Sequence, residues 1–457
     1  MGAAMAVESA AQFARSMLLT RQLGVTEFGI AAAMVTLLTL IEMSTYGGAD
    51  RYLVQARDGD TGEALAVAHT LTVVRNILCA ALLALFAYPT ARLLGVPQAA
   101  GSFMWLAIIP LLRSFEHLRL EQLQRKHRFG PWASASAATN LIGLVAVAVA
   151  AAMLRDHRAV LWGLGTQAVA LVVSTHVVAG VPYRLSFGAA PVARAARFGM
   201  PLMLNGLALA VLGQFDRLAV GTFLGVGQLG RYGLATMIFY VPAALLMRVM
   251  ITVLQPRLSA AWHRSPLWEF PNMFRQINGG VARIAALAGA AAAIIGSPLL
   301  ALLFGSAYAV GDSFFAFFSL GVFFRFARTS VNFGGMAMGR TMDMMLSNVP
   351  IAFGLLVTIT GLKLAPSLTV AAIGSLVAEL VGAIAAFALI RRGLNVSGST
   401  PYGPFVMALP LPCGAAIWTV LASPGLPLRV AVVVVLAASM AASAMLMHYR
   451  ARQPVTD

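Results

Sequence analysis

About fourteen apolar stretches of roughly twenty residues follow one another along the chain, from Ala3 to His448. A helix of about 20 residues crosses the hydrocarbon core of a bilayer, which is about 30 Å thick. These stretches are too long for barrel strands, so we expect an all-α polytopic membrane protein with no soluble catalytic domain. The expected spans are residues 2–21, 28–49, 66–88, 98–118, 133–154, 160–180, 198–222, 230–255, 280–304, 309–331, 344–364, 368–390, 403–422 and 427–448.

The charges that remain are few and unevenly placed. Only 11% of the 457 residues are charged, against about a quarter in soluble proteins, yet the net charge is +16. Lys and Arg assigned to one side of the membrane, with Arg325 and Arg328 counted in an inner loop, outnumber those on the other side by more than two to one. This bias predicts that both termini are cytoplasmic and explains the positive charge without a nucleic-acid partner.

The longest inner loops are expected at residues 50–65, 114–132 and 257–279. The third carries Trp262, Trp268, Phe270 and Phe274 among Arg and Pro, which is typical of an amphipathic segment at the headgroup level. The simplest interpretation of the second and third loops is anchoring to anionic lipid.

An internal repeat indicates how the spans are grouped. Leu23-Gly24-Val25 and Leu224-Gly225-Val226 are each followed by an aromatic–Gly pair and a small-residue helix start. Six spans separate the two turns, which predicts two halves of the same orientation, as in transporters built from parallel repeats. We expect an N-terminal lobe at 1–181, a C-terminal lobe at 182–393, and an additional helix pair with a short tail at 394–457.

Several motifs in combination identify a family resemblance. Arg21-Gln22-Leu23-Gly24 with Phe28-Gly29 resembles the turn after the first span of Wzx-type polysaccharide flippases. These belong to one superfamily with the multidrug (MATE) exporters and the lipid II flippases. The second half of that pattern is similar to Phe198-Gly199-Met200-Pro201, Asp216-Arg217 and Leu224–Gly233, and the colanic-acid-exporter branch is similar at Gln122–Phe129. Family members usually carry a basic segment before the first turn; its absence leads us to expect either an upstream translation start or a short first span.

The resemblance implies a function. Such a protein moves an undecaprenyl-pyrophosphate-linked oligosaccharide from the inner to the outer leaflet of the bacterial inner membrane, by alternating access of two six-helix lobes. It implies the lipid bilayer, a polysaccharide polymerase and chain-length machinery as partners, and surface polysaccharide as the product.

Ionisable residues inside spans are costly and usually face a polar cavity. The planar guanidinium of Arg binds two phosphate oxygens at once, so intramembrane arginines are candidates for a substrate cavity. The candidate cavity residues are Arg15, Arg75 and Arg248, with Gln12, Asn76, Asn205 and Gln214 as polar wall. Pairing of each Arg with a carboxylate alone is the alternative.

Four further charged residues are candidates for gating or ion coupling. Asp216 and Arg217 lie near the outer end of their span, where an ion pair would brace the two halves. Glu42 and Glu379 are carboxylates inside spans, where desolvation favours proton exchange or Na⁺ binding.

Nothing in the sequence predicts an enzyme, a cofactor or a metal site. The seven histidines have no metal-ligand spacing, Cys79 and Cys413 have no CxxC or His partner, and no nucleophile or phosphate-loop motif occurs. A cation-coupled multidrug exporter is the main alternative function. A membrane-embedded polymerase or ligase, which needs a large outer loop, and a purely structural bundle are weaker alternatives.

Overall fold

The computed structural model describes residues 2–265, 268–394 and 402–452. Helices make up nearly all of these residues, and the described part of the chain contains no β-strand. By compactness the chain divides into two units, Met1–Gly233 and Leu234–Asp457, with the boundary inside one long helix. The division into lobes at residue 181, which follows from the repeat, stays a prediction.

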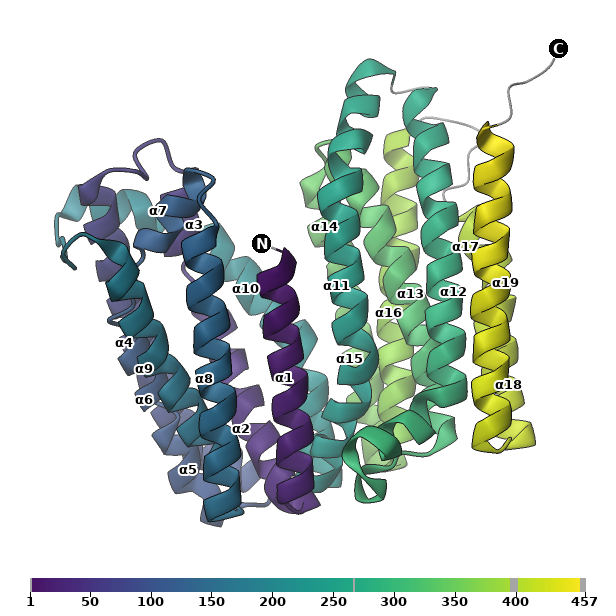
Figure 1. Ribbon diagram of the computed structural model, residues 1–457, viewed down its shortest axis with the longest axis horizontal. Helices are drawn as coiled ribbons and strands as arrows, with labels where there is room; N and C mark the ends of the chain where they lie inside the picture. The colour runs from purple at the N-terminus through teal and green to yellow at the C-terminus, as the bar shows by residue number, and fades with distance from the viewer. Residues whose placement is uncertain (1, 266–267, 395–401, 453–457) are drawn as a thin grey trace. The chain divides into compact units, whose positions relative to one another are not determined.

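In the first unit the helices run side by side as a bundle (Figure 1). They are α1 (Gly2–Gln22), α2 (Val25–Ser44), α3 (Ala49–Gln55), α4 (Gly62–Leu93), the 3₁₀ turn η1 (Pro97–Ala99), α5 (Ala100–Trp105), α6 (Ile108–Arg113), α7 (Arg119–Arg125), α8 (Gly130–Leu154), α9 (Ala159–Ala179) and α10 (Ala189–Leu224).

The second unit begins within α11 (Val226–Arg264). It continues with α12 (Glu269–Phe304), the 3₁₀ turn η2 (Ser306–Tyr308), α13 (Asp312–Ala337), α14 (Thr341–Asn348), α15 (Ile351–Leu364), α16 (Leu368–Leu394), α17 (Gly403–Ala408), α18 (Pro410–Ala422) and α19 (Leu426–Arg452).

The expected spans fall mostly on helix, which confirms the all-α polytopic prediction. Eleven of the described helical segments are long and apolar enough to cross a membrane. The expected span at 98–118 is instead broken into the short helices α5 and α6. The chain is a multi-pass membrane protein.

Helix α8 shows how the polar residues come to lie inside. Leu141, Val145, Val149 and Met153 recur every four residues and lie exposed on one face. This is the reverse of the pattern in a soluble bundle, because the surrounding solvent here is lipid. The opposite face of α8 is therefore available for polar side chains directed into the unit.

The expected loop at 257–279 is mostly helix, and its place at the headgroup level stays a prediction. Helix α11 continues to Arg264 and α12 already begins at Glu269. Phe270 and Phe274 are fully buried in an apolar cluster with Leu258, and Trp262 packs against it. Phe270, Phe274 and Trp262 therefore belong to the packed core of a helical hairpin, because both long helices extend past the expected span ends, whereas Trp268 is 73% exposed.

The core of the second unit joins phenylalanines of α13 to small residues of α12. Phe314, Phe315 and Phe318 are fully buried, and the ring of Phe315 lies directly on Gly296, where a Cβ atom would overlap it. Gly296 of α12 therefore allows close approach of α13.

Arg429 attaches the C-terminal helix to this unit. It was expected at an outer loop but is 7% exposed at the start of α19. Its Nη1 and Nη2 donate to the two carboxylate oxygens of Asp312 on α13, at 2.8 and 2.7 Å. Its Nη1 also donates to the carbonyl of Ile294 on α12, at 3.2 Å. Helices α18 and α19 stand beside α12 at the edge of the unit (Figure 1).

The link between α9 and α10 is pinned by histidines. The Nε2 atom of His69 accepts from the backbone N–H of Leu118 (3.2 Å), so its Nδ1–H donates to the carbonyl of Arg184 (3.0 Å). The ring of Tyr183 stacks on His69 with centroids 4.2 Å apart. The Nε2 of His176 on α9 lies 2.8 Å from the carbonyl of Phe115, which follows α6. These histidines hold the link in place.

Both turns of the repeat are helix–Gly–helix corners, and in the first unit they pack on each other. A Cβ atom on Gly29 would overlap the carbonyl of Val226, and one on Gly230 would lie 3.0 Å from the ring of Phe28. Gly29 of the first aromatic–Gly pair and Gly230 are thus needed for close approach of α2 to the first turns of α11, whereas Gly233 of the second pair has no atom within 4 Å of its Cβ position.

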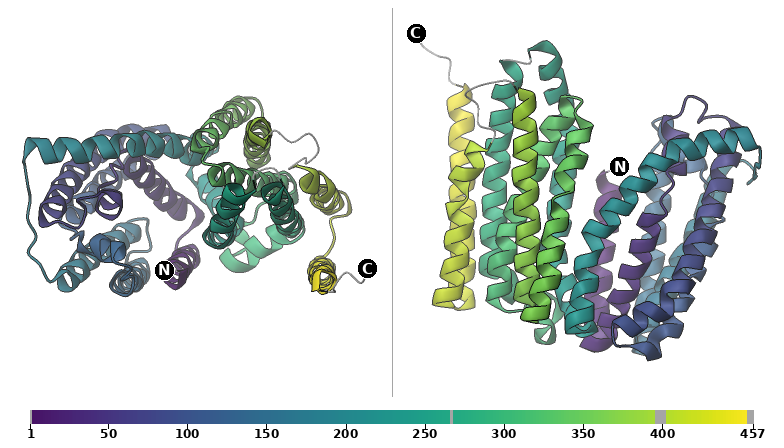
Figure 2. Two further views of the ribbon diagram at one scale, coloured as in Figure 1. Left: turned by 90° about the horizontal axis from the view of Figure 1, so that it is seen from above. Right: turned by 180° about the vertical axis from the view of Figure 1, so that it is seen from behind.

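Glycines also bring α10, which is inclined to the other helices of its unit (Figure 2), onto the end of α2. A Cβ atom on Gly199 would overlap the carbonyl of Gly47, and one on Gly206 would overlap the carbonyl of Met43. Gly213, on the same helix, has no atom within 4 Å of its Cβ position.

We expect Gly206→Ala to lower the thermal stability of the purified protein, because the overlap with a backbone carbonyl forces α10 away from α2. Overpacking of this kind costs about 1–3 kcal/mol. Gly213→Ala is the matched control and should melt at or above the wild-type Tm. Equal melting temperatures for both variants would contradict the close packing of α10 on α2.

Candidate functional site

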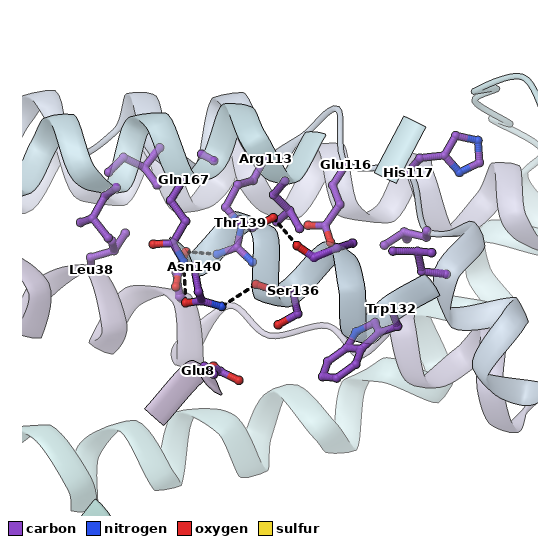
Figure 3. Close-up of a pocket in the computed structure, with 18 of the residues that line it drawn as sticks. Glu8, Leu38, Arg113, Glu116, His117, Trp132, Ser136, Thr139, Asn140 and Gln167 are labelled. Carbon is purple, nitrogen blue, oxygen red and sulfur yellow. Dashed lines mark hydrogen bonds and ion pairs between the residues drawn. The ribbon is translucent and has the colours of Figure 1, made fainter. Parts of the chain in front are cut away.

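Two polar cavities adjoin each other inside the first unit, each about 400 Å³ in volume. The first lies among α1, α2, α6, α8 and α9 (Figure 3), and the second among α4, α10 and the turn between α2 and α3. Arg113, Glu116, Leu118 and Glu121 line both, so they form the wall that the cavities share. Volumes of this size suit small-molecule groups.

A ladder of hydrogen bonds crosses one wall of the first cavity. Arg15 on α1 donates from Nη2 to Oε1 of Gln167 on α9, at 2.9 Å. The Nε2 of Gln167 then donates to Oδ1 of Asn140 (3.1 Å), and Asn140 donates to the carbonyl of Ser136 (2.9 Å). Figure 3 shows the two amides directed toward one another. Because Arg15 can only donate, the orientation of both amides is fixed.

A small residue permits this arrangement. Gly143 of α8 faces the stem of Gln167, where a Cβ atom would lie 2.9 Å from the Cβ of Gln167. Trp132, at the start of α8, completes the wall (Figure 3). The cavity therefore combines an aromatic ring with fixed amide and hydroxyl groups.

Glu42 links two arginines at the other wall. Its Oε1 accepts from Nη1 of Arg113 at 3.0 Å, and its backbone carbonyl accepts from Nη2 of Arg75 at 2.9 Å. The guanidinium of Arg75 also lies 5.9 Å from the centroid of the Tyr46 ring. Arg75 is thus held by neutral groups, and its positive charge is directed to the second cavity. This arrangement differs from simple pairing of Arg75 with a carboxylate.

The shared wall contributes two carboxyl groups that sequence reasoning missed. Burial, and then the neighbouring Asp50 and Glu116, raise the pKa of Glu121 to about 8. Burial likewise raises the pKa of Glu116. At neutral pH Glu121 is therefore protonated and can donate a hydrogen bond. Both residues lie in the 114–132 segment, which was interpreted as a lipid-facing loop. The signal available in the sequence was two carboxylates within a few residues of Arg113. That signal points to a cavity wall only once α7 is known to fold back onto the unit.

The second cavity has its own polar rim. The hydroxyl of Tyr46 donates to the carboxylate of Asp50, with its oxygen 2.8 and 2.9 Å from the two acceptor atoms. Burial, and then the neighbouring Asp50, raise the pKa of Tyr46 to about 12. Met200 and Met203 of α10 form an adaptable apolar side of the same cavity.

The other predicted cavity residues lie elsewhere or are not described. Gln12 is exposed on α1, Asn76 is buried in α4, and Gln214 is half-buried on α10; none of the three lines either cavity, and Arg15 reaches the first cavity only through its bond to Gln167. The side chains of Asn205 on α10 and Arg248 on α11 fall outside the described residues.

Asp216 is engaged by a tyrosine. Its Oδ2 accepts from the hydroxyl of Tyr232 at 2.7 Å, and its Oδ1 accepts from the backbone N–H of Arg217 at 2.8 Å. This contact joins α10 to the first turns of α11 within the first unit. A bracing role for Asp216 and Arg217 stays a prediction.

Glu379 lies in the second unit, 3% exposed on α16. Its oxygens accept from Nε of Arg325 at 2.8 Å and Nε of Arg328 at 3.0 Å. The assignment of these two arginines to an inner loop is wrong, since both lie well inside α13, which continues to Ala337. They were counted with a loop because they lie close to the expected span end at residue 331, and α13 continues beyond it to Ala337. A gating or ion-coupling role for Glu379 stays a prediction.

Comparison with known proteins assigns the chain to a protein family. Residues 18–311 match the family model described as "Polysaccharide biosynthesis protein". No curated protein sequence matches the chain.

Solved structures show the fold. An inward-facing multidrug resistance MATE family transporter of the MOP superfamily matches with a TM-score of 0.68 at 14% identity, covering 85% of this chain and 94% of that one. The lipid II flippase MurJ in an inward closed conformation matches with a TM-score of 0.66 at 11% identity, covering 90% and 97%. A MOP superfamily transporter from Pyrococcus furiosus matches with a TM-score of 0.57 at 14% identity, covering 86% and 93%.

The raised pKa of Glu121 gives a test of the shared wall. Between its ordinary value of 4.5 and about 8, the folded protein binds a proton at Glu121 that the unfolded chain has released. The free energy of unfolding therefore falls as pH rises through this window, with the slope that corresponds to about one bound proton. We expect Tm, measured from pH 5 to pH 9, to fall less steeply for Glu121→Gln than for wild type. Glu63→Gln, at the exposed start of α4, is the control and should keep the wild-type slope; identical slopes for all three proteins would contradict the assignment.

Proposed function

Because the chain belongs to the polysaccharide biosynthesis protein family, we propose that it is a flippase for a lipid-linked oligosaccharide. It moves an undecaprenyl-pyrophosphate-linked repeat unit from the inner to the outer leaflet of the bacterial inner membrane. Transport proceeds by alternating access of two six-helix lobes, residues 1–181 and 182–393, with 394–457 as an additional helix pair. Both termini face the cytoplasm, and a polymerase with chain-length machinery receives the product.

The observation that carries the proposal is the first cavity. Moving a sugar through hydrocarbon requires replacing its water hydrogen bonds with fixed protein partners. Asn140, Gln167, Thr139 and Ser136 offer such partners, and Trp132 offers a flat face for the apolar side of a sugar ring. The fixed orientation of the two amides lowers the entropy that binding would cost.

The positive charges in and between the cavities also support a lipid-linked oligosaccharide as the substrate. Arg75 presents a guanidinium to the second cavity without a carboxylate on it, and Arg113 stands in the wall between the cavities. A substrate with both sugar hydroxyls and phosphate would use the two cavities together. The structural likeness to the lipid II flippase MurJ adds an analogy of fold.

A second candidate function is export of cationic compounds. Glu8, Glu42, Glu116 and Glu121 all line the first cavity beside Trp132, an acidic and aromatic lining that suits an organic cation. The protonation of Glu121 at neutral pH weakens this alternative, because it removes one of the four charges.

The test uses a deletion strain complemented with wild type, Arg75→Ala or Arg92→Ala. We expect the deletion to accumulate undecaprenyl-linked oligosaccharide on the cytoplasmic leaflet and to lose surface polymer. A hydrogen bond to a charged group contributes about 1.5–3 kcal/mol, so Arg75→Ala should restore polymer about tenfold less well than wild type. Arg92, exposed near the end of the same helix, is the matched control and should restore it fully.

Other outcomes separate the two functions. An unchanged lipid-linked pool and unchanged surface polymer in the deletion strain would contradict the flippase. Increased sensitivity to cationic drugs in that strain, with normal polymer, would establish the exporter in its place.

A further inference from the structure

Two hydroxyl groups on the lining of the first cavity can only accept hydrogen bonds from a ligand. The hydroxyl of Thr139 donates its one hydrogen to the carbonyl of Ala135 at 2.6 Å, and the hydroxyl of Thr39 donates to the carbonyl of Val35 at 2.8 Å. Both threonines line the cavity, one from α8 and the other from α2, so each offers a ligand the lone pairs of its oxygen. Acceptors therefore reach the cavity from two helices.

Carboxyl groups add further acceptors to the same cavity. Glu42 uses one oxygen for the bond from Arg113, and its other oxygen accepts no hydrogen bond within the described part of the chain. Glu8, exposed on α1, and Glu116, half-buried after α6, also accept none from the described residues. Figure 3 shows the carboxyl groups of Glu8 and Glu116 on either side of Ser136. A ligand in the cavity thus meets carboxyl oxygens that the protein itself does not occupy.

The charge of the lining is negative. Arg113 is the one arginine or lysine among the described residues that line the cavity, and Glu42 neutralises it. Glu121 is protonated at neutral pH, which leaves Glu8 and Glu116 without an ion-pair partner among the described residues. Burial raises the pKa of Glu116, so a cationic ligand beside it would favour its ionised form. An acidic sugar would instead bring a further carboxylate next to these groups, and repulsion between like charges is strong where water is largely excluded.

The amides of the ladder supply hydrogen-bond donors. Gln167 and Asn140 each use one N–H of the side-chain amide within the ladder, so each keeps one N–H for a ligand. His117 offers none, because its Nδ1 accepts from a backbone N–H and its Nε2–H donates to a backbone carbonyl. The amide donors suit the hydroxyl and ring oxygens of a sugar. The carboxyl and threonine oxygens require a group that donates, and an ammonium group donates three hydrogen bonds and accepts none.

We propose that the first cavity binds an amino sugar with a free amine, and that Glu8 and Glu116 accept hydrogen bonds from its nitrogen. Trp132 packs against the apolar face of the sugar ring, and the amides of Gln167 and Asn140 donate to its oxygens. The proposal rests on the proposed function, and it names the class of sugar that this cavity selects. An amino sugar also accounts for an acidic, aromatic lining in a cavity for oligosaccharide. A uronic acid is excluded, because its carboxylate would meet those of the lining.

The experiment measures binding of disaccharides to the purified full-length protein in nanodiscs of neutral lipid, by saturation-transfer NMR at neutral pH. Chitobiose carries amines where cellobiose carries hydroxyl groups, N,N′-diacetylchitobiose carries uncharged amides there, and cellobiuronic acid carries a carboxylate. We expect chitobiose to bind about tenfold or more tightly than cellobiose, because hydrogen bonds between charged groups are the stronger ones. Diacetylchitobiose should bind as weakly as cellobiose, and cellobiuronic acid should not bind.

Variants locate the preference at the two carboxyl groups. Combining Glu8→Gln with Glu116→Gln should bring chitobiose to the affinity of cellobiose and leave the affinity for cellobiose unchanged. Because retained cellobiose binding shows that the cavity is intact, this result separates loss of charge from unfolding. Trp132→Leu should weaken both sugars by the same factor, since the ring faces the sugar and not its amine. Glu63→Gln, at the exposed start of α4, is the matched control and should keep the wild-type preference.

Several results would overturn the proposal. Equal affinity of wild type for chitobiose and cellobiose, binding of diacetylchitobiose or cellobiuronic acid as tight as that of chitobiose, or an unchanged preference in the double variant would each do so. Competition by tetraethylammonium as strong as by chitobiose would also overturn it, because the cavity would then recognise positive charge without a sugar. If the preference is found and the deletion strain keeps its polymer, the amino-sugar site stands and the proposed function fails. If the deletion strain loses its polymer and the preference is absent, the proposed function stands and the amino-sugar site fails.

Discussion

A polar group inside a lipid-embedded bundle must find its partners within the bundle, because hydrocarbon offers none. The ladder from Arg15 through Gln167 to Asn140 meets this requirement with neutral amides. Arg75 meets it with a backbone carbonyl and an aromatic ring, and Arg325 meets it with a carboxylate and an aromatic ring. In each case the partners fix the cation in position, and only some of them neutralise it.

The same constraint explains the use of small residues. Gly143 lets Gln167 reach Asn140, while Gly199 and Gly206 bring α10 onto α2 and so close the second cavity with Met200 and Met203. Without the hydrophobic effect between helices, close packing of this kind supplies much of the association energy in a membrane. The cavities of the first unit thus depend on glycines that carry no chemistry of their own.

Hydropathy predicted the helices well, because spans of about twenty apolar residues leave little choice of structure. Arg15, Arg75 and Glu42 were chosen because charges inside spans are rare; all three are half-buried, and their roles stay predictions. Glu116 and Glu121 were missed because their segment, 114–132, reads as a charged loop; only the folding of α7 back onto the unit brings them to the cavities. Arg325 and Arg328 were missed because they lie close to an expected span end, and α13 extends beyond that end.

Sequence patterns also failed to show which aromatic and arginine residues are buried and which are exposed. Phe270 and Phe274 resemble a headgroup anchor in sequence yet form a core, and Arg429 resembles a loop residue yet is buried on Asp312. Both depend on contacts between residues far apart in the chain. Gln12 and Asn76, chosen for their polarity, lie away from the cavities because polarity alone does not show which face of a helix points inward.

The central claim is that the first cavity receives the sugar portion of a lipid-linked oligosaccharide. The most direct test replaces Trp132 with a photo-crosslinking amino acid and illuminates cells in which the lipid-linked sugar is radiolabelled. Trp162, 63% exposed on α9, provides the control position outside the cavity. The account predicts a labelled adduct at position 132 and none at position 162. Equal labelling at both positions, or labelling at 162 alone, would contradict it.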